Sequence, residues 1–117
     1  MPHVVLVGKS AVEDIFKALK PILVRNERGI LRTMDSYLES KKNSMLIESL
    51  SIQENRTISF LVMISSREDG VVIRLYPKSE VEKTDGVKRL LAELAKQFMG
   101  TFPDFKLGET NLREYLA

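Results

Sequence analysis

The feature that most constrains the fold is a set of three extended segments in the middle of the chain. Residues 45–53, 57–65 and 71–76 are rich in the β-branched and apolar residues that favour strands. Glu54-Asn55-Arg56 separates the first two segments, and Arg67-Glu68-Asp69-Gly70, which ends in Asp-Gly, separates the last two. Connections this short join neighbouring antiparallel strands. The sequence therefore predicts a β-meander at the centre of the fold.

The middle segment contains Phe60-Leu61-Val62-Met63-Ile64, which is apolar at every position. A strand of this kind is typical of a sheet that is covered on both faces. One layer of helices covers only one face, so we expect a second subunit on the other and predict a homodimer. Residues 101–117, TFPDFKLGETNLREYLA, are also too apolar for a solvated end, so this tail should dock on the domain or on a partner.

A strand and a helix are expected before the meander. Residues 3–7, HVVLV, form a short apolar run that predicts a buried strand. A helix should begin at Ser10, because Ser10 and Glu13 have the S-x-x-E spacing of a capping box. The apolar positions on one face of this helix are Val12, Ile15, Phe16 and Leu19.

The segment that follows Pro21 allows two interpretations. Residues 22–24 form either a short second strand or the start of a kinked helical stretch, because the proline interrupts the first helix. A further helix is expected from Glu27 or Ile30 to Lys42, with Asn43 as its stop. Its apolar positions are Ile30, Leu31, Met34, Tyr37 and Leu38.

A longer helix is expected after the meander. Its start signals are Ser79-Glu80-Val81-Glu82 and then Thr84-Asp85-Gly86, and Gly100 is its stop. Its apolar stripe consists of Val87, Leu90, Leu91, Leu94 and Phe98. Together these elements predict one α+β domain over residues 1–117, in the order β-α-(β/α)-α-β-β-β-α. The sheet is expected to be mainly antiparallel, with four or five strands and helices on one face.

The composition argues against several kinds of chemistry. The chain has no cysteine, which excludes disulfides and thiolate sites, and His3 is its only histidine. Four carboxylates could form a catalytic pair or an oxygen-ligand metal site, but nothing in their spacing selects this over a solvated helix face. They are Glu27, Asp35, Glu39 and Glu48. An enzyme is the least supported class, and we expect no cofactor, no membrane span and a cytoplasmic location.

Gly8-Lys9-Ser10 resembles the end of a phosphate-binding P-loop. The full pattern, G-x-x-x-x-G-K-[ST], requires a glycine at position 3, where this chain has His3. The intervening VVLV predicts a strand and leaves no loop to wrap a phosphate. The capping box is the favoured interpretation, and it leaves Lys9 able to contact a phosphate beside the helix start.

The stretch HVVLVGKSAVEDIFKALKPIL, together with Arg28-Gly29 ahead of ILRTMD, resembles the Alba family of archaeal chromatin and RNA-binding proteins. The resemblance covers residues 3–35. It implies a dimer that binds duplex DNA or RNA largely through the phosphate backbone. Lys9 and Arg28 match the family's basic contacts, and Arg32 is a looser match.

The favoured function is therefore non-enzymatic nucleic-acid binding with little sequence specificity. It would use Lys9, Arg25, Arg28 and Arg32, and it requires these side chains to converge on one surface. The net charge of +2 tolerates a polyanionic partner. The alternatives are an assembly subunit, or a small-molecule or lipid-binding module with a cavity between sheet and helix. The residues that would face such a ligand, and that otherwise form an ordinary core, are Phe60, Val62, Ile73, Leu91 and Phe98.

Overall fold

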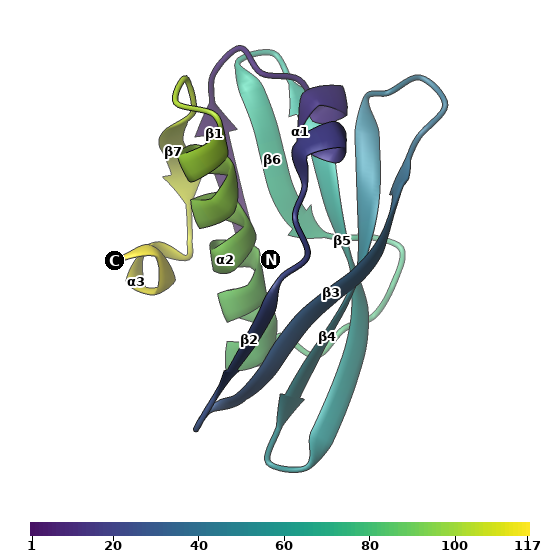
Figure 1. Ribbon diagram of the computed structural model, residues 1–117, viewed down its shortest axis with the longest axis vertical. Coiled ribbons are helices and arrows are strands. Elements are labelled where there is room, and N and C mark those ends of the chain that lie inside the picture. Colours follow the sequence, from purple (N-terminus) through teal and green to yellow (C-terminus); the bar gives the residue numbers. More distant parts are fainter.

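A computed structural model, which describes all residues 1–117, has seven strands and three helices (Figure 1). In chain order they are β1 (His3–Val7), α1 (Val12–Ala18), β2 (Leu23–Asn26), β3 (Gly29–Leu38), β4 (Ser44–Gln53), β5 (Arg56–Arg67), β6 (Gly70–Leu75), α2 (Asp85–Thr101), β7 (Lys106–Thr110) and α3 (Arg113–Leu116). The strands form one antiparallel sheet in the order β2-β3-β4-β5-β6-β1-β7. The predicted meander is confirmed as β4, β5 and β6.

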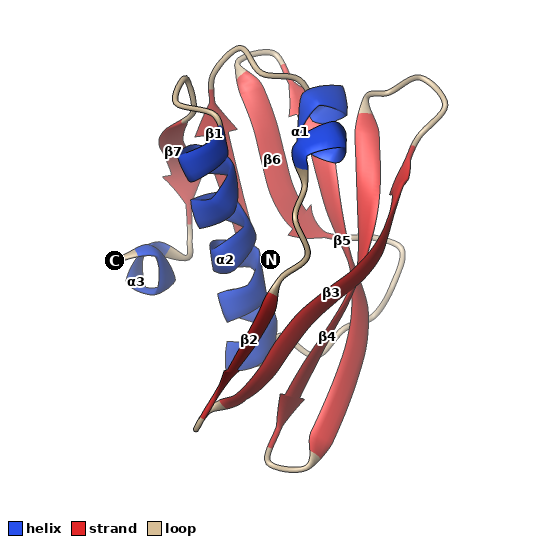
Figure 2. Cartoon of the chain, viewed as in Figure 1, coloured by secondary structure: helices blue, strands red, loops and turns tan.

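The sheet curls into a half-barrel around α2, which lies in its concave side (Figure 2). The apolar stripe predicted for this helix is confirmed, since Val87, Leu90, Leu91, Leu94 and Phe98 are all buried. Thr84 caps the helix by accepting a hydrogen bond from the Val87 N–H. None of the three helices has the length and apolarity needed to cross a membrane.

The predicted fold class is wrong in the number of strands and in the placement of the helices. The sheet has seven strands rather than four or five, because β3 and β7 join it in addition to β2, for which a strand or a helix was left open. The helices do not form a layer on a flat sheet: α2 lies inside the curl, α1 lies at one end of it, and α3 lies beyond the β7 edge (Figure 1). Long antiparallel strands twist and coil, so a sheet of this width wraps around one helix.

The helix predicted up to Lys42 is wrong, and β3 occupies most of that segment. The strand pairing shifts by a bulge between Thr33 and Ser36. Leu31 and Thr33 face the core before the bulge, and the bulge breaks the strict alternation, so apolar residues recur at spacings of three and four. A bulged strand therefore imitated the period of a helix. The strand interpretation of residues 22–24 is confirmed by β2.

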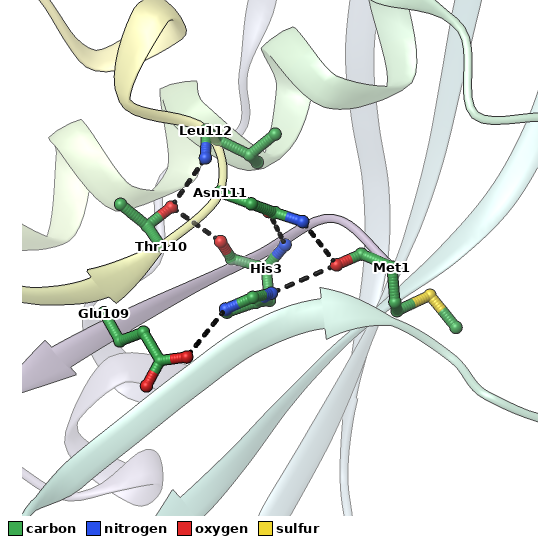
Figure 3. Close-up of polar contacts among 6 residues, drawn as sticks. All are labelled: Met1, His3, Glu109, Thr110, Asn111 and Leu112. Atoms are coloured by element: carbon green, nitrogen blue, oxygen red, sulfur yellow. Dashed lines mark hydrogen bonds and ion pairs between the residues drawn. The ribbon is translucent and has the colours of Figure 1, made fainter.

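The C-terminal tail packs on the domain and is tied to the N-terminus. β7 pairs with β1, and Phe105 and Leu112 are buried. The His3 N–H donates to Asn111 Oδ1 at 3.0 Å, and the Thr110 hydroxyl donates to the His3 carbonyl at 2.7 Å (Figure 3). Asn111 Nδ2 also donates to the Met1 carbonyl oxygen at 2.9 Å. The two ends of the chain thus meet at the β1–β7 edge.

Candidate nucleic-acid interface

Two segments that combine glycine with a basic residue lie at opposite ends of the sheet. We call the end that holds the β1–α1 loop and the β3–β4 and β5–β6 turns the upper end, and the end that holds the β2–β3 and β4–β5 turns the lower end (Figure 1). Gly8-Lys9-Ser10 lies at the upper end, and Arg28-Gly29 lies at the lower end. Lys9 therefore does not converge with Arg28.

At the upper end, the backbone N–H groups of the β1–α1 loop all donate within the chain. The Lys9 and Ser10 N–H groups donate to Asp104 Oδ2 at 2.7 and 2.9 Å, and the Ser10 hydroxyl donates to Asp104 Oδ1 at 2.9 Å. The Gly8 N–H donates to the Asp69 carbonyl at 3.0 Å. Hydrogen bonds from the Ser10 N–H and hydroxyl, and then from Lys9, hold the pKa of Asp104 below its usual value.

The predicted capping box between Ser10 and Glu13 is wrong, because Ser10 is bound to Asp104 instead. Helix α1 begins after Ala11, whose N–H donates to Asp14 Oδ2 at 2.9 Å. Alanine has no side-chain oxygen, so only half of a capping box is present. Glu13 is free for another role: Lys42 Nζ lies 3.0 Å from Glu13 Oε2 and, by its hydrogen bond, lowers the pKa of that carboxyl.

A phosphate has no backbone donor left in this loop, because two are bound to Asp104 and the others to the Asp69 carbonyl and the Asp14 carboxylate. The loop does border an open hollow of about 580 Å³, but Glu68 and Asp69 line its other side. Asp69 is paired with Arg67 at 3.2 Å. The loop at the upper end is therefore an anion-binding loop, and the anion that it binds is the Asp104 carboxylate of the same chain. The Lys9 side chain is exposed and forms no ion pair.

At the lower end, three arginines share one hairpin. Arg25 on β2 pairs with Ile30, and Arg32 on β3 pairs with Leu23, so both side chains lie on the outer face as diagonal neighbours. Arg28 lies in the turn, where its N–H donates to Asn26 Oδ1 at 2.8 Å. All three arginines are exposed, and none forms an ion pair.

Three other basic residues, Lys41, Lys42 and Arg56, do not join this group as free charges. Lys41 and Lys42 lie in the β3–β4 turn at the upper end, and Lys42 is paired with Glu13. Arg56 lies near the hairpin but donates two hydrogen bonds, of 2.7 and 3.1 Å, to Glu82. We therefore define the arginine hairpin as β2, β3 and their turn, with Arg25, Arg28 and Arg32 as its basic side chains.

The residues considered for a ligand cavity or a metal site serve the packing of the core or the shape of a turn instead. The five residues expected to face a ligand between sheet and helix all belong to the packed core, with exposures of 5% or less. The structure holds no group of three or more His, Cys, Asp or Glu side chains placed to bind a metal. Glu39, for example, accepts hydrogen bonds from the Lys41 and Asn43 N–H groups and shapes a turn.

Asp104 is the residue that sequence reasoning missed at the upper end. Its partners Lys9 and Ser10 are more than ninety residues away along the chain, and Phe102-Pro103-Asp104 carries no recognised motif. The β7 pairing with β1 brings the two segments together. Only the three-dimensional pairing identifies this contact.

Comparison with known proteins gave no match: no protein-family model fits the chain, and searches of curated proteins and of solved structures found no relative. The resemblance to the Alba family stays a prediction.

Proposed function

We propose that this protein binds the phosphate backbone of nucleic acid through the arginine hairpin. The observation that supports the proposal is the gathering of three exposed arginines, without ion-pair partners, on one hairpin at a sheet edge. A guanidinium group presents several N–H donors in one plane and binds phosphate oxygens in a bidentate manner. No acidic side chain has to be displaced before Arg25, Arg28 and Arg32 bind such an anion.

The proposed binding has little sequence specificity and involves no catalysis. Residues 23–32, LVRNERGILR, contain no aromatic side chain on which a base could stack. Contacts of arginine with phosphates fix the position of a protein on a nucleic acid but do not identify its bases. The proposed partner is DNA or RNA, and the proposed location is the cytoplasm.

We further propose that the binding form is a homodimer. The tail packs on its own domain, so the remaining apolar surface is the outer face of the sheet. Two copies would present two arginine hairpins to one nucleic acid, which raises the affinity through the effective concentration of the second site.

Fluorescence anisotropy with labelled duplex DNA and structured RNA tests the nucleic-acid proposal. We expect the hairpin variant Arg25→Glu/Arg28→Glu/Arg32→Glu to lose binding. A matched control with the same change of net charge is Lys9→Glu/Lys41→Glu/Lys106→Glu, because these exposed lysines lie at the upper end and form no ion pair. The control should bind nearly as tightly as the wild type.

Two outcomes would contradict the proposal. Equal loss of binding in both triple variants would mean that net charge, and not the hairpin, governs the interaction. Flat titrations of the wild type at low salt would mean that the protein does not bind these nucleic acids. Circular dichroism of both variants at the titration temperature verifies that each remains folded.

A further inference from the structure

The outer face of the sheet carries no helix (Figure 2). Most side chains on this face are apolar, and Ser79, Glu80 and Val81 of the β6–α2 loop border it beside Glu48 and Leu61. Along β5, Phe60, Val62 and Ile64 point into the core and are buried, whereas Leu61 and Met63 point outward and are only half-buried. The strand predicted to be covered on both faces is thus covered on one. The apolar residues of the outer face are Leu23, Ile30, Met34, Tyr37, Leu46, Leu50, Ile52, Leu61, Met63 and Val72.

Two polar atoms on this same face have no hydrogen-bond partner. Arg74 Nε and Ser65 Oγ are shielded from solvent and unpaired. Arg74 pairs with Met63, and Ser65 pairs with Val72, so the two side chains are diagonal neighbours on β5 and β6. The Arg74 guanidinium forms no ion pair either. A shielded polar group without a partner is costly, so this position favours an incoming acceptor.

An acidic group lies on the other side of β5. Glu48 on β4 pairs with Leu61 and therefore points to the outer face. After burial, its charge is the next largest cause that raises the pKa of the Tyr37 phenol. No basic side chain forms an ion pair with Glu48. Leu61 and Met63 thus lie between an unpaired carboxylate and an unpaired guanidinium.

This arrangement is self-complementary. A two-fold axis that lies between two stacked sheets, passes close to Leu61 and Met63 and runs oblique to the strands exchanges the β4 side of one copy with the β6 side of the other. We propose that a second copy of this chain covers the outer face, with Glu48 of each copy opposite Arg74 of the other. The inference rests on the homodimer proposed above and is independent of nucleic-acid binding.

The size of the face suits a stable dimer. The strands β4, β5, β6 and β1 have 10, 12, 6 and 5 residues, and the part of β3 beyond Arg32 adds about five. At about 3.3 Å per residue and about 4.8 Å between strands, they cover on the order of 600 Å² per copy. That is the lower end of the range for a standard interface, and it leaves Arg32 outside the contact. Two sheets stacked face to face also exclude water from apolar side chains in the way that a β-sandwich core does.

Charge reversal with sedimentation equilibrium tests this interface. Glu48→Arg places two guanidinium groups opposite each other, and Arg74→Glu places two carboxylates there, so each single variant should dimerise roughly a hundredfold more weakly than the wild type. The double variant should recover the dimer. A mixture of the two single variants should form a heterodimer, because every charge is then opposite its complement.

Glu68→Arg is the matched control, since Glu68 is exposed in the β5–β6 turn, away from the outer face, and it should leave the dimer unchanged. For the wild type, methyl resonances of Leu61 and Met63 should shift with protein concentration, a measurement that needs no substitution. A wild-type protein that stays monomeric at its highest soluble concentration overturns the proposal. A dimer unaffected by both single variants, with no shift at Leu61, overturns it as well.

The two proposals fail separately. A monomer that still binds nucleic acid through the hairpin overturns only the interface, and a Glu48/Arg74 dimer that binds no nucleic acid overturns only the nucleic-acid proposal.

Discussion

The upper and lower ends of the sheet contain similar sequence motifs, but the polar groups are bound within the chain at the upper end and free at the lower end. Each has a glycine beside a basic residue, Gly8-Lys9 above and Arg28-Gly29 below. Above, Asp104 accepts the loop N–H groups and Lys42 is paired with Glu13. Below, three arginines of one hairpin form no ion pair. A basic motif therefore indicates a ligand site only where the fold leaves its donors unsatisfied.

The two glycines themselves provide the largest expected effect. Gly29 has φ of +126°, and a Cβ there would collide with the Ile52 carbonyl oxygen, so Gly29→Ala should destabilise the fold by about 3 kcal/mol or more. Gly8 has no positive φ, but a Cβ would lie 2.8 Å from both Asp104 Oδ2 and Phe105 Cδ1. Gly8→Ala should therefore cost less, and thermal unfolding of both variants measures the difference.

Gly100→Ala is the control for this pair, because a Cβ at that helical position would meet nothing within 4 Å. It should be neutral or stabilising by up to about 1 kcal/mol. Equal melting temperatures for all three variants would contradict the steric requirement for glycine at positions 8 and 29.

The next largest effect should come from removing the internal anion at the upper end. Asp104→Ala leaves the Lys9 and Ser10 N–H groups and the Ser10 hydroxyl without their acceptor, so the melting temperature should fall at pH 7. Sulfate can then occupy the vacated position, since loop N–H groups bind anions. Added sulfate should raise the melting temperature of this variant more than that of the wild type; an equal rise would contradict the proposed role of Asp104.

The pH dependence of the same contact follows from the lowered pKa of Asp104. The unfolded chain binds this proton at the usual value of 3.8, and the folded chain binds it only at lower pH. The stabilisation from the carboxylate is therefore present above pH 3.8 and is lost as the pH falls through the folded-state pKa. The melting-temperature gap between wild type and Asp104→Asn should be wide at pH 7 and narrow at low pH.

At the lower end, a single substitution should have a moderate effect on binding. Each arginine that neutralises one phosphate releases counterions, so Arg28→Ala should reduce the slope of log K against log salt by about one unit. Lys9→Ala at the upper end should leave the slope unchanged. Titrations over a range of salt concentrations measure both slopes, and a larger loss for Lys9 would reverse the comparison.

The smallest expected effect concerns Tyr37 on the outer face. Burial, followed by Glu48 and Asp35, raises the pKa of its phenol. Glu48→Gln removes one negative charge and should lower that pKa toward its ordinary value. An NMR titration of labelled tyrosine detects the change. Glu54→Gln, at an exposed position in the β4–β5 turn, should leave the pKa of Tyr37 unaltered.

The parts of the fold that local sequence patterns determine were predictable. The meander, α2 and its Thr84 cap follow from alternation, turn residues and helical spacing over short stretches. β3 was not predictable in this way, since the bulge between Thr33 and Ser36 disguised its period. The polar segment KLGET becomes β7 only because the free edge of β1 provides its hydrogen-bond partners.

The candidate site shows the same limit. Sequence placed Arg25, Arg28 and Arg32 within a few residues of one another, so their grouping survives the change from a predicted helix to a hairpin. Lys9 was assigned to the same surface, although no local sequence pattern fixes its position relative to the three arginines. The contact of Asp104 with Lys9 and Ser10 depends on β7 docking beside β1, which no short-range pattern encodes.

The position of β1 between β6 and β7 has a consequence for biosynthesis. β1 is synthesised before both of its partners, which begin at Gly70 and Lys106, so it has no sheet partner until at least β6 has been made. At a synthesis rate of about 5–20 residues per second, the apolar run Val4–Val7 stays unpaired in the nascent chain for several seconds. Pairing of such distant segments also slows folding after release. We therefore expect newly synthesised chains to bind chaperones through this unpaired apolar strand until β6 and β7 have formed.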